Sequence, residues 1–489
     1  MTAPCKETVF GVETEARLLT EFRRAAALVP SYRTLLQEGD VRAGDVLDLA
    51  SFIRLCPLLS KANTFDRFPL EELSVGGQLL DVADVLTSSG HGGRFSFGVI
   101  SRKQMSSNAD LMDRAFDEAF SVKSRKTLTV NCLPMGVVFA SNCMTVATTS
   151  VREDMAIALV ETFGHLYEQI VLCGDPLFMK RFTDYARERQ IEWRRYRVKA
   201  MLGEEIFGEH FRTYLAASLG VSLDQHGEST IVSSFGVGEL GLHLCYETPA
   251  TIGLRRAALG HPAFARDVLG VHTDDGVSLP MIFAFNPLRT LIEVVDRDAH
   301  GYGTMTTSML DPDRAVPLLR YQTGDIVRLL DHTQVADAAR RHSVTLAADL
   351  PPTLLALKGR DKDALPNGSH VGFYKDVLYS DHQIARRLTG AFRTTFAGDE
   401  CTMHVQLVPA QVSDASIELS ILDAMPPRVR PERLVLWPYA RFPFGMGLDY
   451  ERKFVHYVPG ERAPDADGVE PPLGASPRES VRGSSEAAR

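Results

Sequence analysis

The amino-acid sequence predicts an α/β protein. A large N-terminal domain, with parallel-rich sheets and a β-rich subdomain, is followed by a small α+β C-terminal domain. Two observations carry this prediction: short apolar runs alternate with helical stretches from about 127 to 219, and short strands dominate from 228 to 332. A composition break at 350–368 marks the expected joint between the domains. Alternation of strands and helices is typical of parallel sheets.

The first part of the chain is expected to be helical. Apolar residues recur at helical spacing in 12–37, and a second helical patch, LDLASFIRL, covers 47–55. A further helix is expected at 105–122. Ser106 or Ser107 would be its N-cap, because a serine side chain can accept a hydrogen bond from a free backbone N–H group of the first turn.

The central part alternates between two kinds of segment. Runs such as TLTVNCLP and EQIVLCG are apolar and rich in β-branched residues, as buried strands are. The stretches between them have helical spacing. We therefore expect strands at 127–134, 168–174 and 197–204, and helices at 152–164, 176–189 and 205–219.

The domain organisation follows from composition. Beyond the joint, the sequence predicts a helix at 383–396 and strands in CTMHVQLVP, SIELSIL and RLVLWPY. After Pro459 the chain is rich in Pro, Gly, Ser and charge, which predicts a disordered tail. The expected boundaries are 1–357 for the large domain, 358–459 for the small domain and 460–489 for the tail.

Charge and cysteine content restrict the class of protein. The formal net charge is −9, which disfavours a general nucleic-acid or anionic-membrane surface. The seven cysteines are scattered and form no CxxC pair, so neither a disulfide framework nor a structural zinc site is expected. The start, MTAPCKETVFGVETEARLL, has no apolar signal region, and no apolar run is long enough to span a bilayer. We expect a cytoplasmic protein without nucleic-acid or membrane partners.

The loop LTSSGHGGRFSFG (86–98) is the first candidate site. Its glycines let several backbone N–H groups approach one point, and Thr87, Ser88 and Ser89 add hydroxyl donors for phosphate oxygens. The loop lacks GK[ST], so it is not a Walker A motif. The alternative is a plain Gly/Ser turn, which is the favoured interpretation of the loop taken alone.

Two later turns hold single carboxylates. Glu239, in SSFGVGELGLHL (233–244), would hold Mg²⁺ bridged to a phosphate; the alternative is a tight β-turn with an exposed glutamate. Asp325 follows the TG turn of YQTGD. It would accept the two hydroxyls of a ribose, and the alternative is an aspartate that stabilises its own turn.

Two charged segments complete the set. LKGRDKD (357–363) lies on the expected domain joint and contains Arg360. Lys453 lies in the last folded segment, where its charge would stabilise a transferring phosphoryl group. Without context, a solvated surface lysine is the more common case.

Taken in order, these segments resemble the motifs of the adenylate-forming superfamily of acyl-CoA synthetases and related ligases. The family's phosphate loop is similar to T-S-G-[ST]-T-G-K-P, which Thr87, Ser88 and Gly92 match. Its Y-G-x-T-E corresponds to FGVGE (235–239), its Y-R-T-G-D to YQTGD (321–325), and its G-R-x-D-D to GRDKD (359–363).

Other segments narrow this resemblance. The stretch from VPSYRTLLQEG to KANTFDRFP resembles the short N-terminal segment of phenylacetate-CoA ligases, capsular-biosynthesis homologues and the acyl-protein synthetases of bacterial luminescence. Residues 202–221 are similar to the G-[AG]-E segment of the same proteins. The resemblance covers about residues 28–458.

The resemblance implies an ATP-dependent ligase whose small C-terminal domain is mobile. It would activate a small carboxylic acid, aromatic or other, as an acyl-adenylate. The acyl group would then pass to a thiol, of CoA, of a carrier-protein phosphopantetheine or of a cysteine in a partner protein, or to an amine. The wall of the acyl pocket would include NCLPMGVVFASNCM (131–144), for which plain sheet core is the alternative. The implied ATP-binding residues are Thr87, Ser88, Ser89, Gly92, Gly236, Asp325 and Arg360, the implied catalytic residues are Lys453, Glu239 and His91, and the implied Mg²⁺ ligand is Glu239.

The sequence also departs from the family pattern. Gly93 and Arg94 stand where the phosphate loop usually has its lysine and proline, and His91 stands where a hydroxyl residue is usual. Lys453 is assigned by position, because the final segment has no clean G-K-x-x-R. These departures motivate an alternative: a non-catalytic homologue that binds nucleotide and recruits a partner.

Overall fold

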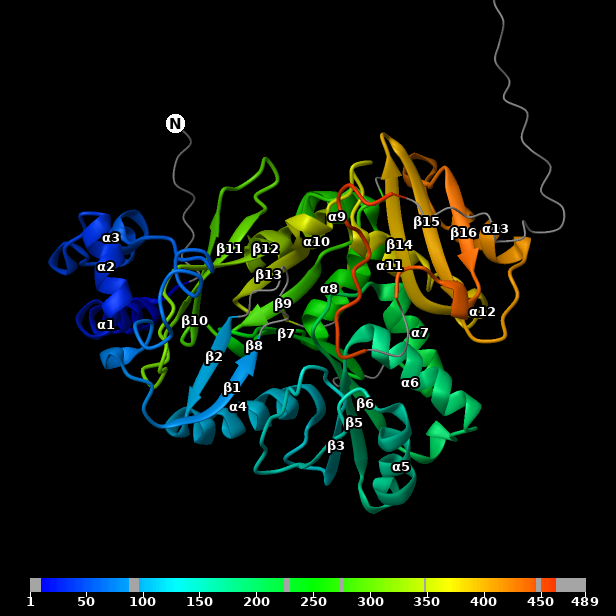
Figure 1. The fold of residues 1–489 in the computed structure, drawn as a ribbon, viewed down its shortest axis with the longest axis horizontal. Coiled ribbons are helices and arrows are strands. Elements are labelled where there is room, and N and C mark those ends of the chain that lie inside the picture. The colour runs from blue at the N-terminus through cyan, green and yellow to red at the C-terminus, as the bar shows by residue number, and fades with distance from the viewer. Residues whose placement is uncertain are drawn as a thin grey trace, which may run out of the picture.

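The computed structural model describes residues 10–87, 96–223, 229–272, 276–346, 349–445 and 450–462. Across this described part, eleven strands form one large sheet, which runs through the middle of the molecule (Figure 1). Its strand order is β10-β11-β12-β13-β9-β8-β7-β6-β5-β3-β4.

One half of the sheet is parallel, as the alternation of strands and helices predicts. Its strands are β3 (Thr127–Asn131), β4 (Thr145–Thr148), β5 (Gln169–Gly174), β6 (Val198–Leu202) and β7 (Ile231–Val237). Every residue of β3, β5 and β6 is buried, as expected for parallel strands covered on both faces.

The other half is antiparallel and forms the expected β-rich subdomain. It contains β8 (Gly241–Tyr246), β9 (Met281–Phe285), β10 (Thr290–Val295), β11 (Gly303–Met309), β12 (Tyr321–Leu330) and β13 (Leu354–Arg360). β13 pairs with both β9 and β12, so the composition break at 350–368 contains a central strand. The expected boundary after residue 357 falls inside it.

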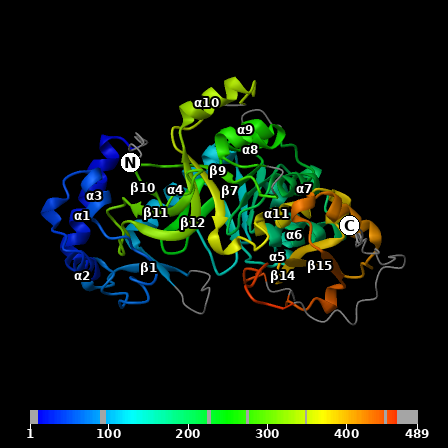
Figure 2. The same ribbon diagram turned by 90° about the horizontal axis from the view of Figure 1, so that it is seen from above.

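Helices pack around the sheet, and α1–α3 form one end of the molecule (Figures 1 and 2). They are α1 (Val12–Leu28), α2 (Pro30–Glu38), α3 (Leu49–Leu55), α4 (Arg102–Phe120), α5 (Glu153–Phe163), α6 (Pro176–Glu188), α7 (Glu209–Leu219), α8 (Pro249–Gly260), α9 (Pro262–Leu269) and α10 (His332–Arg341). α8 and α9 lie between 228 and 332, where the sequence predicts mainly short strands, so the prediction is wrong for this part.

Local chemistry explains where α4 begins. Its N-cap is Ser101, not Ser106 or Ser107. Ser101 accepts a hydrogen bond from the backbone of Gln104, whose side chain in turn accepts one from the backbone N–H of Ser101. This capping box satisfies two groups at once, which a serine one turn later would not do.

The C-terminal part forms a second, smaller sheet. Its strands are β14 (Leu388–Ala397), β15 (Glu400–Leu407) and β16 (Arg433–Trp437), with α11 (Val371–Val377), α12 (His382–Ala385) and α13 (Ala415–Asp423) beside them. The helix expected at 383–396 is wrong, because most of that segment is β14, paired with β15. The strand expected for SIELSIL is also wrong, because this segment makes up most of α13, which Asp414 caps.

The two ends of the described chain lie at opposite ends of the molecule. Both views show α1–α3 at one end and the β14–β15 sheet at the other (Figures 1 and 2). A single buried core nevertheless includes residues from the N-terminal helices, the large sheet and the small sheet, such as Phe22, Val130 and Phe392. A short hairpin of β1 (Val82–Thr87) and β2 (Phe97–Ser101) flanks α4. Within the described residues, no helix is both long and apolar enough to cross a membrane.

Candidate active site

One cavity gathers most of the described residues that the sequence singled out. It has a volume of about 370 Å³, and its wall includes Thr87, Gly236, Glu239, Arg360 and Lys453. These residues come from four segments that are far apart in the sequence. The fold therefore brings together residue types that can bind phosphate, a metal ion and a carboxylate.

A second cavity, of about 550 Å³, continues from the first. The second adds Asp325, and the two share Glu204, Ser234, Gly236, Arg360 and Lys453. Asp325 thus lies along the same wall as the other predicted residues, and we treat the two cavities together as the candidate active site.

The glycine loop is only partly described. Ser88, Ser89, His91 and Gly92 lie outside the described residues, whereas Thr87, the exposed last residue of β1, lines the first cavity. A Cβ atom on Gly98 would lie 2.1 Å from the backbone oxygen of Gly238. Only glycine permits this approach, which packs the hairpin β1–β2 against the turn that holds Glu239.

Glu239 lies in the turn between β7 and β8, and its side chain is buried. The hydroxyl of Tyr321 donates a 2.6 Å hydrogen bond to its Oε1, and Arg314 donates to its backbone oxygen. Burial, together with the charge of Glu239, raises the pKa of Tyr321, so the hydroxyl stays protonated and remains a donor. The contact orients the carboxylate and occupies one of its two oxygens.

The donor set suits Mg²⁺ held jointly with a substrate. Within the described residues, no group of three or more His, Cys, Asp or Glu side chains could hold a metal ion. Mg²⁺ is commonly bound by one or two carboxylates together with substrate phosphates, so a metal at Glu239 would need phosphate oxygens to complete its coordination.

Asp325 and Arg360 are partners across neighbouring strands. They face each other in the register of β12 and β13, and Arg360 Nε donates to Asp325 Oδ1 at 3.3 Å. Asp325 is 4% exposed, and its Oδ2 is buried without a hydrogen-bond partner. Burial raises the pKa of this carboxyl against the opposing effect of Arg360. A buried acceptor without a donor costs free energy, and a ligand hydroxyl would satisfy it.

Lys453 enters the same wall from the final described segment. Its Nζ donates to the backbone oxygen of Glu204 at 2.8 Å and lies 2.9 Å from the Glu204 carboxylate. Its neighbour Glu451 accepts a hydrogen bond from the backbone of Met135 at 2.7 Å. The segment is thus held against the loops that follow β3 and β6. The charge of Lys453 opposes the effect of burial on the pKa of Asp325, which stays raised.

Sequence reasoning missed several side chains of this site. Glu204 and Tyr321 lie within quoted motifs, yet neither was assigned a role. His243 lines the first cavity with a left-handed backbone (φ 56°), stacks on Tyr246, and places Nδ1 2.9 Å from Ser234 Oγ. Burial lowers the pKa of His243 to about 3, so its ring is neutral. No sequence signal marks this histidine, because only the pairing of β7 with β8 brings it to Ser234.

Comparison with known proteins relates the architecture to solved structures. No protein-family model matches the chain, and no curated protein matches its sequence. A crystal structure of 2-hydroxyisobutyryl-CoA ligase in the postadenylation state, in complex with R3-HIB-AMP, matches with a TM-score of 0.63 and 13% identity over 94% of each chain. An open conformation of the same ligase, in complex with 2-HIB-AMP and CoA, gives a TM-score of 0.53 and 14% identity, over 94% of this chain and 96% of that chain.

At this level of identity the likeness establishes a shared fold alone. The chain shares its overall fold with that of 2-hydroxyisobutyryl-CoA ligase, which agrees with the predicted α/β fold with a large N-terminal and a small C-terminal part. A second postadenylation structure of the ligase, with 2-HIB-AMP, also scores higher than the open form, at 0.62 and 13% identity over 94% of each chain.

Proposed function

We propose that this protein is an ATP-dependent ligase that activates a carboxylic acid as an acyl-adenylate and then transfers the acyl group to a thiol. The observation that carries the proposal is the unpartnered buried oxygen of Asp325, on the wall that also holds Glu239 and Lys453. A ribose hydroxyl fits that oxygen, and a phosphate chain extending toward Glu239 would pass the end of the hairpin at Thr87.

In the first step, a carboxylate oxygen of the acid attacks the α-phosphorus of ATP. The bond to the bridging oxygen of pyrophosphate breaks, and pyrophosphate leaves with the electron pair. Asp325 would hold the ribose and Lys453 the carboxylate, so that both reactants keep one geometry. The positive charges of Lys453 and Arg360 would stabilise the negative charge that builds up on the phosphoryl oxygens.

Glu239 would be the protein's ligand to Mg²⁺, with Tyr321 fixing its orientation. When bound there with phosphate oxygens, Mg²⁺ would neutralise the charge of the departing pyrophosphate. Thr87, Ser88, Ser89 and Gly92 are proposed to hold the phosphates, and His91 to contact a phosphate or the acid's carboxylate.

In the second step, a thiol attacks the acyl carbon, the bond to the phosphate oxygen breaks, and AMP leaves while the thiol loses its proton. Lys453 lies in the wall of both cavities, and we propose that the thiol approaches through this wall. We therefore propose that the small domain, from the segment after Arg360 to about residue 459, is mobile and rotates about that segment. CoA is the simplest acceptor, and a carrier-protein phosphopantetheine or an amine would use the same opening.

The finer assignment rests on the sequence resemblance. We propose an enzyme of the phenylacetate-CoA ligase type, acting in the cytoplasm. Leu133, Met135, Val137 and Phe139, from the expected acyl-pocket segment, line the first cavity and support this assignment.

Acid-dependent exchange of labelled pyrophosphate into ATP tests the proposal. Exchange with at least one acid of a broad panel, abolished in Asp325→Ala, supports it. ATP binding by calorimetry without exchange for any acid would instead favour the alternative, a nucleotide-binding homologue without catalysis.

A further inference from the structure

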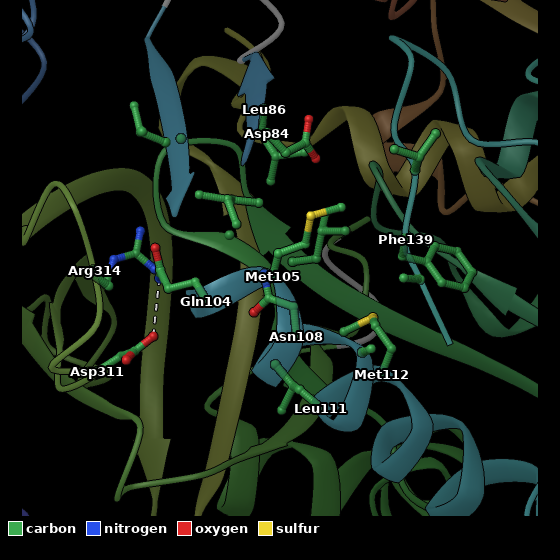
Figure 3. A pocket seen from close by; sticks show the side chains of 18 of the residues that line it. Asp84, Leu86, Gln104, Met105, Asn108, Leu111, Met112, Phe139, Asp311 and Arg314 are labelled. Carbon is green, nitrogen blue, oxygen red and sulfur yellow. Dashed lines mark hydrogen bonds between the residues drawn. The ribbon is translucent and has the colours of Figure 1, made fainter. Parts of the chain in front are cut away.

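A separate cavity of about 290 Å³ plays no part in the mechanism above. It lies between the hairpin β1–β2, helix α4 and the segment 138–140 (Figure 3). Its volume is near the lower end of the range for ligand pockets, which is roughly 300–1,000 Å³.

The lining of this distal cavity is mainly apolar. Helix α4 presents Met105, Ala109 and Met112 to it, at the spacing that places side chains on one helix face. Figure 3 shows Phe139 on the far side of the cavity from Arg314 and Asp311. Methionine side chains are flexible, so this wall suits an apolar group that can itself adopt several shapes.

The polar side chains at the other end already have partners. Gln104 donates to Asp311 at 3.2 Å, as the dashed line in Figure 3 marks. Arg314 donates through both terminal nitrogens to the backbone oxygens of Glu239 and Leu240. Arg289 likewise donates through both terminal nitrogens to the backbone oxygens of His243 and Leu242 in β8. Arg314 Nε is buried without a hydrogen-bond partner, but the terminal nitrogens of both arginines are engaged within the protein. An apolar occupant therefore fits the mainly apolar cavity better than a charged one.

The distal cavity adjoins the candidate active site. The two share Leu86, Met112, Phe139, Gly238 and Leu242 as lining residues. The two cavities are therefore neighbours along this shared wall, and we expect rotamer changes of Met112 and Phe139 to join them. Phe139 packs on Phe116 of the active-site wall, with ring centroids 5.4 Å apart.

We infer that the acid carries an extended, flexible aliphatic tail, which passes between Met112 and Phe139 into the distal cavity while its carboxylate stays near Lys453. This inference rests on the proposed function and names its substrate class. A small acid, whether aliphatic or aromatic, would fill the active site alone and leave the distal cavity unused.

Exchange of pyrophosphate into ATP is measured with acetate, hexanoate, decanoate, benzoate and 4-phenylbutyrate. The variants are Ala109→Leu, which fills the cavity from its buried side, and Met105→Trp, which fills it from its rim. Met105 is 46% exposed, so its substitution leaves the core intact. The matched control is Met155→Trp on α5, because Met155 is 45% exposed and lies outside the cavity.

We expect kcat/KM of the wild type to rise at least tenfold from acetate to decanoate. Both cavity variants should lower it at least tenfold for decanoate and less than threefold for acetate, and Met155→Trp should change neither. An equal preference for acetate and decanoate, or for benzoate over both, overturns the inference while leaving the proposed function standing. So does a wild-type length profile in Met105→Trp.

Calorimetric binding of decanoate without ATP separates the two claims. Binding that Met105→Trp weakens, with no exchange for any acid, supports the tail site and overturns the proposed function. Absence of both binding and exchange overturns both.

Discussion

Lys453 and Glu204 are separated by 249 residues in sequence, yet the ammonium group contacts both the backbone oxygen and the carboxylate of that glutamate. The contact joins the final described segment to the loop after β6. It holds the lysine in the wall of the candidate active site, where Glu204 balances its charge. Under the proposed function, a substrate carboxylate would take that place.

Replacing Lys453 by alanine should affect one half-reaction only. We expect Lys453→Ala to lower kcat for pyrophosphate exchange by about 10²–10³-fold, the cost of removing one group that stabilises transition-state charge. Thioester formation from a chemically prepared acyl-adenylate should change less than fivefold. Lys103→Ala is the control, since it removes another lysine ion pair, with Asp313, at the exposed start of α4. Equal losses in both half-reactions would show that Lys453 acts through the structure.

Replacing Asp325 by asparagine should change stability and ATP binding in opposite directions. Burial disfavours the charged carboxyl, so Asp325→Asn should raise the melting temperature of the ligand-free protein. The same change weakens hydrogen bonds to the ribose. A hydrogen bond to a charged group contributes about 1.5–3 kcal/mol, so KM for ATP should rise roughly 10- to 100-fold. Thermal melts with and without ATP measure both effects.

The partner of Asp325 tolerates this change, because the Arg360 side chain is 35% exposed and can turn to water. Asp337→Asn, on exposed α10, should alter neither quantity. An Asp325→Asn protein with wild-type KM for ATP would remove Asp325 from the ribose site.

Substitutions at Glu239 and Tyr321 should distinguish a loss of metal binding from a loss of stability. Glu239→Gln removes a proposed Mg²⁺ ligand and should raise the Mg²⁺ concentration for half-maximal exchange about tenfold or more. Tyr321→Phe keeps the ligand but removes the donor to its Oε1. We expect that variant to lose about 1–3 kcal/mol of unfolding free energy, with a smaller change in Mg²⁺ dependence. Exchange activity as a function of Mg²⁺ concentration tests the first effect, and urea unfolding tests the second. Identical Mg²⁺ curves for Glu239→Gln and the wild type would contradict the assignment of Glu239 as a Mg²⁺ ligand.

The sequence predicts best where a segment's own residues decide its structure. α6 is expected at 176–189 and observed at Pro176–Glu188, because Asp175 caps it and Pro176 fits its first turn. β3, β5 and β6 follow from apolar runs that can only be buried. In each case the signal lies within a few residues of the element.

The sequence-based prediction is wrong where contacts outside a segment determine its secondary structure. The segment after Ile384 has helical spacing, yet pairing with β15 makes it β14. SIELSIL has β-branched residues, yet the cap at Asp414 starts a helix there. The charges and flanking prolines of β13 predict a domain joint, but this segment pairs with β9 and β12 as a strand of the large sheet. Pairing across a sheet is not encoded locally, so it overrides weak propensity.

The same division holds for the site. Glu239, Asp325, Arg360 and Lys453 were named from motif order, and the fold places them along one wall. Glu204 and the Ser234–His243 pair were not named, because their importance comes only from what lies across from them. The distal cavity was invisible for the same reason, since its walls come from β1, α4 and the segment 138–140.

Asp175 provides a test of the electrostatics independent of catalysis. It accepts hydrogen bonds from the backbones of Leu177 and Phe178 as the cap of α6, and it is 9% exposed. Burial, followed by the nearby charge of Glu205, raises its pKa to about 7. Between its ordinary pKa, about 4, and this value, the folded state binds more protons than the unfolded state, so stability falls as pH rises through that window.

Asparagine caps a helix as well as aspartate but carries no charge. Asp175→Asn should therefore match the wild type near pH 4 and exceed its unfolding free energy by roughly 2 kcal/mol at pH 8. Urea unfolding at pH 4, 5, 6, 7 and 8 measures the difference. Asp48→Asn is the control, because hydrogen bonds from Ser51 lower the pKa of this exposed helix cap. The difference in unfolding free energy between Asp48→Asn and the wild type should therefore be constant from pH 5 to pH 8. A constant difference for Asp175→Asn as well would mean that its carboxyl titrates at the ordinary pKa, with the two backbone N–H groups offsetting the cost of burial.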